Sequence, residues 1–308
     1  MLKEFTIVVN SCDKYECAWD PFFKLLKINW PQCENHKIIL NTETKEYNCD
    51  FLDVTSVCGG DNVTWSARLK AILEKIDTEI VLFFLEDFFL QEKVNQDMFN
   101  EALQLISEDD SVGYIGLKYS SERVFADKNF IPGERFFSRD LLATTYRITA
   151  MSVLWKKDWL IELLNEKENA WEFEVNASVR SKKYLYKVLE INNLNGVCPP
   201  VFTFEDKIKY GYGITQGQWL PKNKELFERF GIDADFSTIG INYKLYEQAN
   251  EDNAPNKPKK NALMNPIEII YNWKKEFLIK NRLKGLLLCL NQNGQPLLEL
   301  ITVLLIWT

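Results

Sequence analysis

Six consecutive apolar residues, Ile80 to Leu85, are followed at once by two acids, Glu86 and Asp87. A run this short and unbroken is typical of a strand buried on both faces, as in a parallel sheet covered by helices. In open α/β sheets ligands bind just outside the carboxyl ends of the strands, and a carboxylate is costly to bury without a partner. We therefore expect Asp87 to hold a metal ion, a ribose hydroxyl or a sugar. The alternative is a strand-end acid that caps a neighbouring helix.

Strand and helix patterns alternate through the first ninety residues. The residues over 5–9 and 37–40 predict strands, and apolar residues at helical spacing predict helices after Asp20-Pro21 and from Trp65 onward. With the strand over 80–85, this alternation predicts a parallel sheet with right-handed crossovers. A further helix is expected near 99–106, and further strands over 112–117 and 146–155. Neither a Gly-x-Gly-x-x-Gly motif after the first strand nor a P-loop motif is present, which argues against both of those nucleotide-binding classes.

Small and polar residues follow the first two predicted strands. Asn10, Ser11 and Asp13 come after the first, and Asn41 comes after the second. Backbone amides of such a loop can approach a nucleotide, and Asp13 can accept a hydrogen bond from a base or a ribose. Arg68 falls in the first turn of the helix from Trp65, where a guanidinium can bind phosphate through two hydrogen bonds. The alternatives are an ordinary strand-to-helix loop and a solvated helix charge.

Two acids alternate with two aromatic residues in Trp171-Glu172-Phe173-Glu174. In an extended segment the acids would share one face and the rings the other. A carboxylate beside aromatic walls has a raised pKa, which suits a general base. The alternative is a strand whose acids face water.

A loop rich in glycine and aromatic residues spans 210–219, Tyr-Gly-Tyr-Gly-Ile-Thr-Gln-Gly-Gln-Trp. Glycines at this density predict a flexible or tightly turned segment. Such a loop can close over a sugar or a base, or it can be a plain surface hairpin.

Composition excludes several classes of protein. The net charge of −7 and the pI of about 5.1 argue against a nucleic-acid binder. The seven cysteines form no Cys-x-x-Cys pair and His36 is the only histidine, so zinc sites and Cys-His catalysis have little support. Unpaired cysteines fit a reducing cytosol, and the first residues lack the apolar run of a signal peptide.

The C-terminal part differs in composition from the rest. Residues 247–266 are rich in Asn, Lys and Pro and predict a linker. Residues 267–308 combine a basic helical pattern with an apolar run over 297–307, which is too short to span a bilayer. This combination fits a membrane-surface anchor, and it fits a terminal helix packed on the domain equally well.

Four motifs occur in order: Ser11-Cys-Asp-Lys-Tyr15, Trp65-Ser-Ala-Arg68, Leu85-Glu-Asp-Phe-Phe89 and Trp171-Glu-Phe-Glu174. With them, the chain over about residues 4–245 resembles bacterial glycosyltransferases of the GT-A type. More narrowly, it resembles the sugar transferases of capsule and lipopolysaccharide O-antigen synthesis. The resemblance implies a GT-A-like, Rossmann-type α/β domain over residues 1–246, with a mainly parallel sheet flanked by helices. It also implies a nucleotide-sugar donor bound at the carboxyl ends of the first strands.

The resemblance assigns roles to particular residues. The usual Asp-x-Asp motif is replaced here by Glu86-Asp87, and adjacent residues on a strand point to opposite faces. We therefore choose Asp87 as the ligand of a divalent ion, Mg²⁺ or Mn²⁺, although the departure leaves metal dependence open. Glu174, or else Glu172, takes the place of the carboxylate that deprotonates the acceptor. The implied donor-side residues are Asn10, Ser11, Asp13, Tyr15, Asn41, Trp65, Arg68, Glu86 and Asp87, and the acceptor-side residues are Trp171, Tyr212 and Trp219.

The predicted function is transfer of a sugar from a nucleotide-sugar to a hydroxyl of a glycan or lipid-linked glycan, with inversion, in surface polysaccharide synthesis. The expected location is the cytoplasm, on the cytoplasmic face of the inner membrane. One alternative is a nucleotidyltransferase of sugar activation, which would normally carry a glycine-rich loop near the N-terminus. The other is a non-catalytic membrane-associated scaffold, which the tail fits and the polar strand ends do not.

Overall fold

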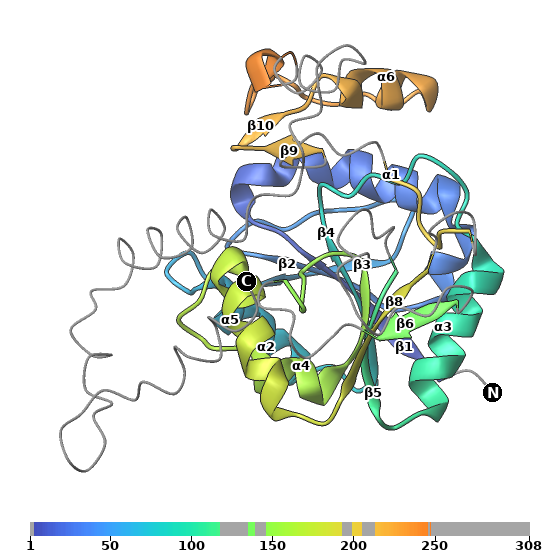
Figure 1. The fold of residues 1–308 in the computed structure, drawn as a ribbon. Helices are drawn as coiled ribbons and strands as arrows, with labels where there is room; N and C mark the ends of the chain where they lie inside the picture. The colour runs from blue at the N-terminus through green and yellow to red at the C-terminus, as the bar shows by residue number, and fades with distance from the viewer. Residues whose placement is uncertain are drawn as a thin grey trace, which may run out of the picture. The chain divides into compact units, whose positions relative to one another are not determined.

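The computed structural model describes residues 3–117, 135–138, 146–192, 199–204, 213–245 and 247 of the 308-residue chain. An eight-stranded sheet, in the order β3-β2-β1-β4-β7-β5-β8-β6, runs through it (Figure 1). Its strands are β1 (Phe5–Asn10), β2 (Ile38–Thr42), β3 (Val54–Cys58), β4 (Ile80–Leu85), β5 (Val112–Gly116), β6 (Phe136–Ser138), β7 (Val153–Lys156) and β8 (Lys187–Ile191). Only β7 and β6 run against the direction of the other strands. The predicted α/β class with a mainly parallel sheet is confirmed.

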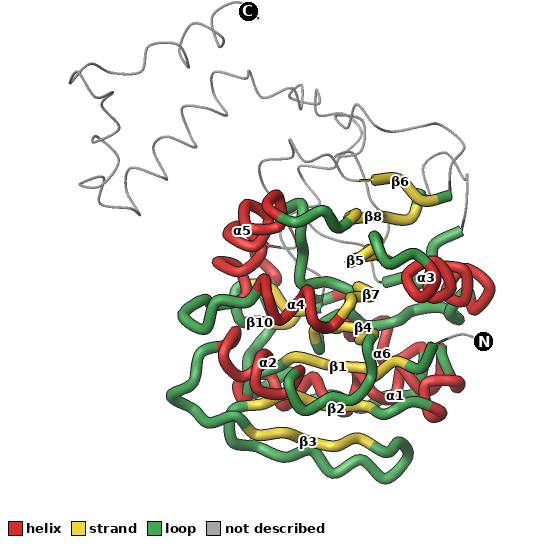
Figure 2. The backbone as a smooth tube through the Cα atoms, turned by 90° about the horizontal axis from the view of Figure 1, so that it is seen from below, coloured by secondary structure: helices red, strands yellow, loops and turns green. Residues whose placement is uncertain are grey.

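Helices cover both faces of this sheet. The helices of the described residues are α1 (Trp19–Asn29), α2 (Trp65–Leu73), α3 (Gln96–Glu108), α4 (Lys157–Leu163), α5 (Ala170–Arg180) and α6 (Lys222–Arg229), with 3-10 helices η1 (Asp13–Ala18), η2 (Pro31–Asn35) and η4 (Ser181–Lys183). Helices α1 and α3 pack on one face and α2, α4 and α5 on the other (Figure 2). In β4, Leu82 and Phe84 join the first core and Val81 and Phe83 join the second. Burial on both faces is therefore the reason for the unbroken apolar run.

The order of the strands creates a switch point between β1 and β4. From β1 the chain moves outward to β2 and β3, and then returns to place β4 on the other side of β1. In open α/β sheets the crevice at such a point, outside the carboxyl ends of the strands, is where ligands bind. Glu86 and Asp87 directly follow β4, so the fold puts them at this position.

Strand β7 lies between β4 and β5 and is antiparallel to both. Its first residue, Val153, pairs with Phe83 near the carboxyl end of β4. The segment 146–152, which leads into β7, therefore runs along the edge of the sheet that carries Glu86 and Asp87. The strand expected over 146–155 is confined to Val153–Lys156, because only these residues meet partner strands.

The hairpin of β9 (Ile214–Thr215) and β10 (Gln218–Trp219) ends in a tryptophan that is fully buried. Its ring centroid lies 5.8 Å from that of Phe89, 5.8 Å from that of Phe227 and 5.3 Å from that of Phe236. Trp219 is thus a core residue, and no part of its ring is left open to an acceptor. Tyr212, the other predicted acceptor-side residue of this loop, lies outside the described residues.

Trp219→Ala should destabilise the protein by about 3 to 5 kcal/mol, because a large ring is removed from a packed core. Chemical denaturation measures this loss. Trp171→Ala is the matched control, since that side chain is 77% exposed, and it should change the free energy of unfolding by less than about 0.5 kcal/mol. Equal losses for the two variants would contradict the placement of Trp219 in the core.

None of the helices in the described part of the chain is both long and apolar enough to cross a membrane. The predicted linker, apart from Glu247, and the predicted tail over 267–308 lie outside the described residues.

Candidate functional site

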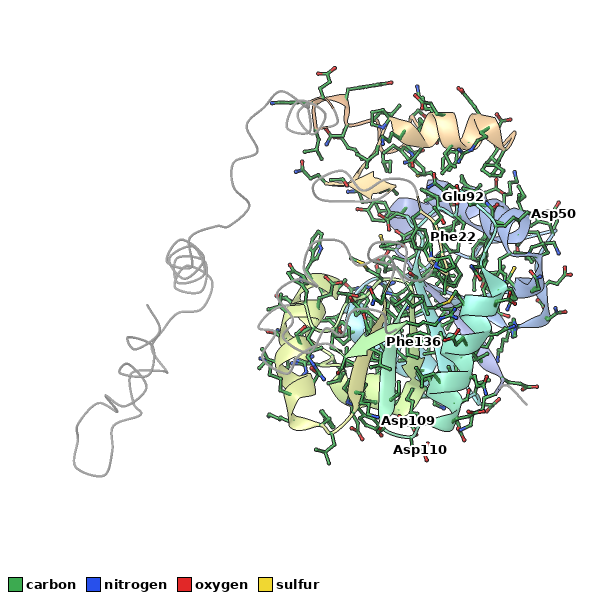
Figure 3. The ribbon with its side chains drawn as sticks, turned by 45° about the vertical axis from the view of Figure 1, so that its right-hand side comes forward. Phe22, Asp50, Glu92, Asp109, Asp110 and Phe136 are labelled. Carbon is green, nitrogen blue, oxygen red and sulfur yellow. The ribbon has the colours of Figure 1, made fainter. Side chains whose placement is uncertain are left out.

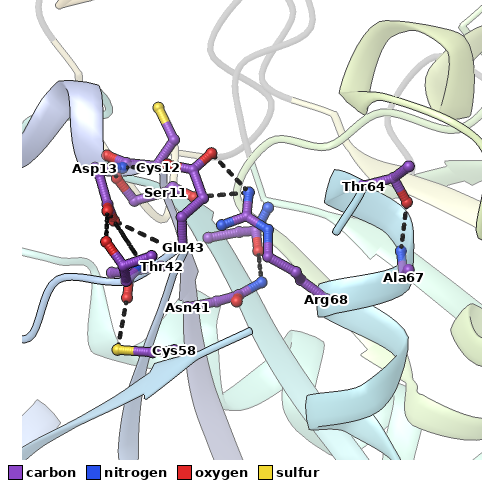
Figure 4. A network of polar contacts seen from close by, with 12 residues as sticks. Ser11, Cys12, Asp13, Asn41, Thr42, Glu43, Cys58, Thr64, Ala67 and Arg68 are labelled. Carbon is purple, nitrogen blue, oxygen red and sulfur yellow. Dashed lines mark hydrogen bonds and ion pairs between the residues drawn. The ribbon is translucent and has the colours of Figure 1, made fainter. Parts of the chain in front are cut away.

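Polar residues from three neighbouring strands meet at the switch point. Asn10 is in register with Leu85 of β4 on one side and with Asn41 of β2 on the other. The residues that follow these three positions therefore leave the sheet side by side. Figure 4 shows the polar network that the residues after β1 and β2 form with the start of helix α2.

Asp13 and Glu43 hold the loops after β1 and β2 together. The Asp13 carboxylate accepts hydrogen bonds from the backbone N–H groups of Glu43, Thr44 and Lys45 at 3.0 to 3.2 Å. In return, the Glu43 carboxylate accepts from the Asp13 N–H at 2.7 Å. Partial burial raises the pKa of Asp13, but the hydrogen bonds from Thr44 and its neighbours outweigh it and the pKa is lowered. Asp13 thus shapes the loops, and its oxygens are already engaged rather than free for a base or a ribose.

Arg68 is buried beneath these loops, with 3% of its surface exposed. Its Nη2 lies 3.5 Å from the Ser11 carbonyl oxygen and 3.5 Å from Oε1 of Glu43. Its Nε and Nη1 have no hydrogen-bond partner within the part of the chain that the structure describes. The alternative of a solvated helix charge is wrong. A buried guanidinium with two unpaired nitrogens is costly, so the position favours an incoming anionic or carbonyl group.

Local sequence explains how Arg68 reaches this position. Thr64 begins helix α2 as its N-cap, accepting a hydrogen bond from the Ala67 N–H at 3.2 Å. Gly59 packs directly on the arginine stem, where a Cβ atom would lie 2.6 Å from Cγ of Arg68. Trp65, the first residue of the helix, turns toward the core instead, with its ring 5.5 Å from that of Phe173. Trp65 therefore packs helix α2 against α5, and no ligand contact is needed to explain its position.

Three predicted donor-side residues tie the strands together. Asn10 and Asn41 are buried, and Oδ1 of Asn10 accepts a hydrogen bond from Nδ2 of Asn41. The hydroxyl of Ser11 accepts one from Nε1 of Trp19 at 2.7 Å. Nδ2 of Asn10 and Oδ1 of Asn41 have no partner among the described residues. These side chains form the floor of the site.

Glu86 and Asp87 lie in a turn, because β4 ends at Leu85. The strand alternation that would send them to opposite faces therefore does not apply to them. Burial raises the pKa of Asp87 to about 6. Burial, and then the charge of Asp87, raise the pKa of Glu86 well above its usual range. Two adjacent acids, of which Glu86 is buried and Asp87 half-buried, favour the uptake of a proton or a cation.

The acid pair fits a divalent cation in part. Mg²⁺ is usually bound by one or two carboxylates, with waters and substrate phosphates completing its shell. Among the described residues, no group of three or more His, Cys, Asp and Glu side chains is placed so that it could hold a metal ion. Glu86 and Asp87 would therefore hold the ion together with diphosphate oxygens.

The start of the β9–β10 hairpin, with the glycine before it, contacts Asp87 directly. The Gly213 N–H donates to the Asp87 carbonyl oxygen at 3.0 Å, and the Ile214 N–H donates to Oδ2 of Asp87 at 3.4 Å. A Cβ atom at Gly213 would lie 2.7 Å from that carbonyl oxygen, so only glycine allows this approach. The sequence predicted the turn here, whereas the contact with Asp87 depends on tertiary structure.

Tyr15 lies near the same acids. Burial raises its pKa to about 12, with further contributions from the charges of Cys12, Glu86 and Asp87. The hydroxyl of Tyr15 would be 3.9 Å from a Cβ atom at Gly217, which has a φ of +77°. The tip of the hairpin therefore faces the loop that follows β1.

The Trp171-Glu172-Phe173-Glu174 segment is helical, and the expected extended conformation is wrong. It forms the first turn of α5, where Asn169 is the N-cap. Asn169 and Glu172 form a capping box, with two reciprocal hydrogen bonds of 3.0 Å between side chain and backbone. The Asn-x-x-Glu spacing was the sequence signal for this helix. The two acids therefore lie on different sides of α5, because residues two apart in a helix are turned by about 200°.

Glu174 points to the segment that leads into β7. Its Oε1 accepts a hydrogen bond from the Ala150 N–H at 2.8 Å. Since residues 146–152 run along the carboxyl edge of β4, this contact brings Glu174 to the same edge as Glu86 and Asp87. Glu172 instead caps the helix, and Trp171 is exposed to solvent.

Not every acid next to a strand belongs to the site. Asp109 and Asp110 lie at the opposite end of the sheet, before β5 (Figure 3). They form ion pairs of 2.9 Å with Lys187 and Lys156. Hydrogen bonds from Ser111 and Lys187 lower the pKa of Asp109 to about 2, the reverse of the shift at Asp87.

No protein-family model matches the chain, and no curated protein matches it by sequence. Solved structures are similar in fold. A structure of S. aureus TarS 1-349 is 15% identical over 62% of this chain and 58% of that chain, with a TM-score of 0.43. The mannosyltransferase PcManGT from Pyrobaculum calidifontis, in complex with GDP-Man and Mn²⁺, is 12% identical over 91% of this chain and 76% of that chain, with a TM-score of 0.48. A cytidylyltransferase from Leptospira borgpetersenii is 10% identical over 60% of this chain and 74% of that chain, with a TM-score of 0.37.

The chain spans less than two thirds of the TarS structure. Likenesses this distant carry no argument about activity, so the function must be argued from the site itself.

Proposed function

We propose that the chain is a glycosyltransferase of the GT-A type that uses a nucleotide-sugar donor. One observation carries this proposal: the edge of the sheet at the carboxyl ends of β1, β2 and β4 holds an acid pair, of which Glu86 is buried and Asp87 half-buried, and the buried guanidinium of Arg68, two of whose nitrogens have no partner among the described residues. A nucleoside diphosphate with its divalent ion matches this pairing, since the nucleotide offers acceptors to Arg68 and the ion neutralises the acids. The order of the four sequence motifs agrees with it.

Transfer would proceed by one in-line displacement. An acceptor hydroxyl oxygen attacks the anomeric carbon while Glu174 takes the hydroxyl proton, and the bond from that carbon to the diphosphate oxygen breaks. Glu86 and Asp87 would hold a divalent ion, which would supply positive charge to offset that of the departing nucleoside diphosphate. The Ala150 N–H holds one oxygen of Glu174 and so orients the carboxylate.

The acceptor and the cellular setting follow from the sequence resemblance. We infer a glycan or lipid-linked glycan acceptor in surface polysaccharide synthesis, on the cytoplasmic face of the inner membrane. The basic and apolar composition of residues 267–308 supports attachment to that surface.

A nucleotidyltransferase is the second candidate, because it also combines strand-end acids with a divalent ion. The two activities differ in their products. Purified protein should be incubated with UDP-, GDP-, CMP- and dTDP-sugars, with Mg²⁺ or Mn²⁺ present. Release of free nucleotide and sugar from one donor supports the proposal, whereas formation of a nucleotide-sugar and pyrophosphate from a sugar phosphate and a nucleoside triphosphate would identify a nucleotidyltransferase.

Arg68→Met should weaken donor binding by about 10- to 100-fold, because a charged hydrogen-bond donor is lost from the site. The melting temperature should be unchanged or higher, since the variant removes two buried, unpaired nitrogens. Isothermal titration calorimetry with the nucleoside diphosphate measures the first effect, and thermal unfolding measures the second.

Arg180→Met is the matched control. Arg180 is fully engaged, with hydrogen bonds of 2.7 and 2.6 Å to the buried Glu168 carboxylate. This variant should lower stability and leave nucleotide affinity unchanged. Unchanged affinity in Arg68→Met as well would exclude Arg68 from the donor site.

A further inference from the structure

Helix α5 exposes a row of apolar side chains along its outer face. Trp171, Val175 and Val179 recur every four residues and are 77%, 37% and 55% exposed. Residues four apart lie on the same side of a helix, so the three form a continuous strip, which we name the α5 stripe. Phe173 and Ala177, on the inner side, are buried against the sheet. Packing within the described domain therefore does not explain the stripe.

The surroundings of the stripe are basic, although the chain has a net charge of −7. Lys182 and Lys183 follow α5 directly in η4, and Lys167 precedes it. No ion pair involves these three lysines among the residues that the structure describes. Of the nearby acids, Glu166 is paired with Lys70 at 2.6 Å.

Two acids lie on α5 itself. Glu174 is turned toward the Ala150 N–H, and Glu172 lies next to the stripe. Its carboxylate accepts a hydrogen bond from the Asn169 N–H and so serves the helix terminus. The three lysines therefore set the sign of the charge at both ends of the stripe.

We propose that the α5 stripe is a docking surface for an anionic phospholipid bilayer. Tryptophan is favoured at membrane interfaces because the apolar part of its ring can enter the bilayer while its N–H stays near water. Valines on the same face can enter the acyl boundary, while flanking lysines reach the headgroup phosphates. The lysines select a negatively charged surface, which distinguishes a bilayer of this kind from an uncharged apolar partner.

The composition of the C-terminal residues independently indicates binding to an anionic bilayer. Residues 274–284 contain five Lys and Arg, and residues 297–307 are apolar except for one Glu and one Thr. Stable attachment of a peripheral protein usually requires two membrane-binding signals, each of them weak alone. The α5 stripe supplies the second signal on the folded domain. This inference goes beyond the proposed function, because it requires neither donor nor acceptor.

The test is flotation of the full-length protein with vesicles of phosphatidylcholine, alone or mixed with phosphatidylglycerol. The triple variant Trp171→Ser/Val175→Ser/Val179→Ser should partition on the order of tenfold more weakly into the mixed vesicles. Tyr243→Ser is the matched control, because Tyr243 is 51% exposed and lies outside α5, and it should partition like the wild type. Lys182→Glu/Lys183→Glu should reduce the preference for phosphatidylglycerol, and the basic residues over 274–284 should retain part of it.

Wild-type partitioning of the triple variant would overturn the proposal. A large fall in its melting temperature would also overturn it, because the stripe would then be covered within the folded chain. A change in its oligomeric state without a change in vesicle binding would show instead that copies of the chain meet there. Nucleotide affinity, measured on the same samples, reports on the proposed function separately, so either inference can fail alone.

Discussion

Replacing Asp87 by asparagine should lower the rate of sugar transfer at least about a hundredfold while the protein stays folded. The carboxylate would help to hold the ion and diphosphate whose charge must be stabilised as the bond to the sugar breaks, and such electrostatic contributions are typically this large. Product formation at saturating donor and Mn²⁺ measures the loss. Asp109→Asn is the matched control, because Asp109 pairs with Lys187 at the far end of the sheet, and it should leave turnover unchanged.

The stability of the Asp87→Asn variant should show whether its activity is lost through the site chemistry or through unfolding. Burial raises the pKa of Asp87 to about 6 in the folded protein, above the ordinary value of 3.8. The wild type therefore loses stability as the pH rises through about 6, because folding then requires burial of a charge. Without ligand, Asp87→Asn should thus be at least as stable as the wild type near pH 8, and it should show less of this decline. Near-wild-type turnover in the variant would remove Asp87 from the site.

Replacing Glu174 by glutamine should lower kcat by about 10² to 10⁴, the usual contribution of a positioned general base. Glutamine keeps an oxygen that can accept the hydrogen bond from the Ala150 N–H, so the side chain should stay in place. It cannot take the proton of the acceptor. The KM for the donor should change little, and steady-state kinetics with a fixed acceptor separates the two parameters.

Glu172→Gln is the internal control for this experiment. Glu172 serves the capping box of α5, and glutamine can fill the same position. Its effect on kcat should be small. If Glu172→Gln were the slower variant, the assignment within the segment would be reversed. If both variants turned over normally, the base would lie elsewhere or the reaction would proceed with retention.

The arrangement of the sheet shows how far sequence reasoning reaches. The unbroken run over 80–85 predicted a strand buried on both faces, and β4 is buried between two cores. The alternation of patterns predicted parallel strands, because parallel neighbours must be joined by crossovers and these are usually helices. Strand β7 was predicted as a strand, but its place between β4 and β5 was not. Strand order depends on contacts between distant segments, and the pattern within one segment carries no information about them.

In the candidate site, too, some features could be predicted from the sequence and others could not. Polar residues after β1, β2 and β4 were visible in the sequence, and parallel pairing of these strands brings them to one edge. Glu43 was missed as a partner of Arg68 and Asp13, although it stands in the polar stretch after the second strand. The helix at Trp171-Glu172-Phe173-Glu174 was mistaken for an extended segment, because alternation over four residues also fits one turn of a helix whose N-cap is overlooked.

The sequence by itself determined strands β1, β2 and β4 and helices α1 and α2. It also determined the chemical types of residue at the strand ends and the burial of β4 on both faces. These follow from local propensity and from hydrophobic periodicity, which neighbouring residues set. Only the tertiary structure decided that Arg68 is buried with unpaired nitrogens, that Trp219 belongs to the core and that the oxygens of Asp13 are engaged. Burial and hydrogen-bond partners depend on residues far along the chain, so the pKa values and the charge balance of the site exist only once those residues have met.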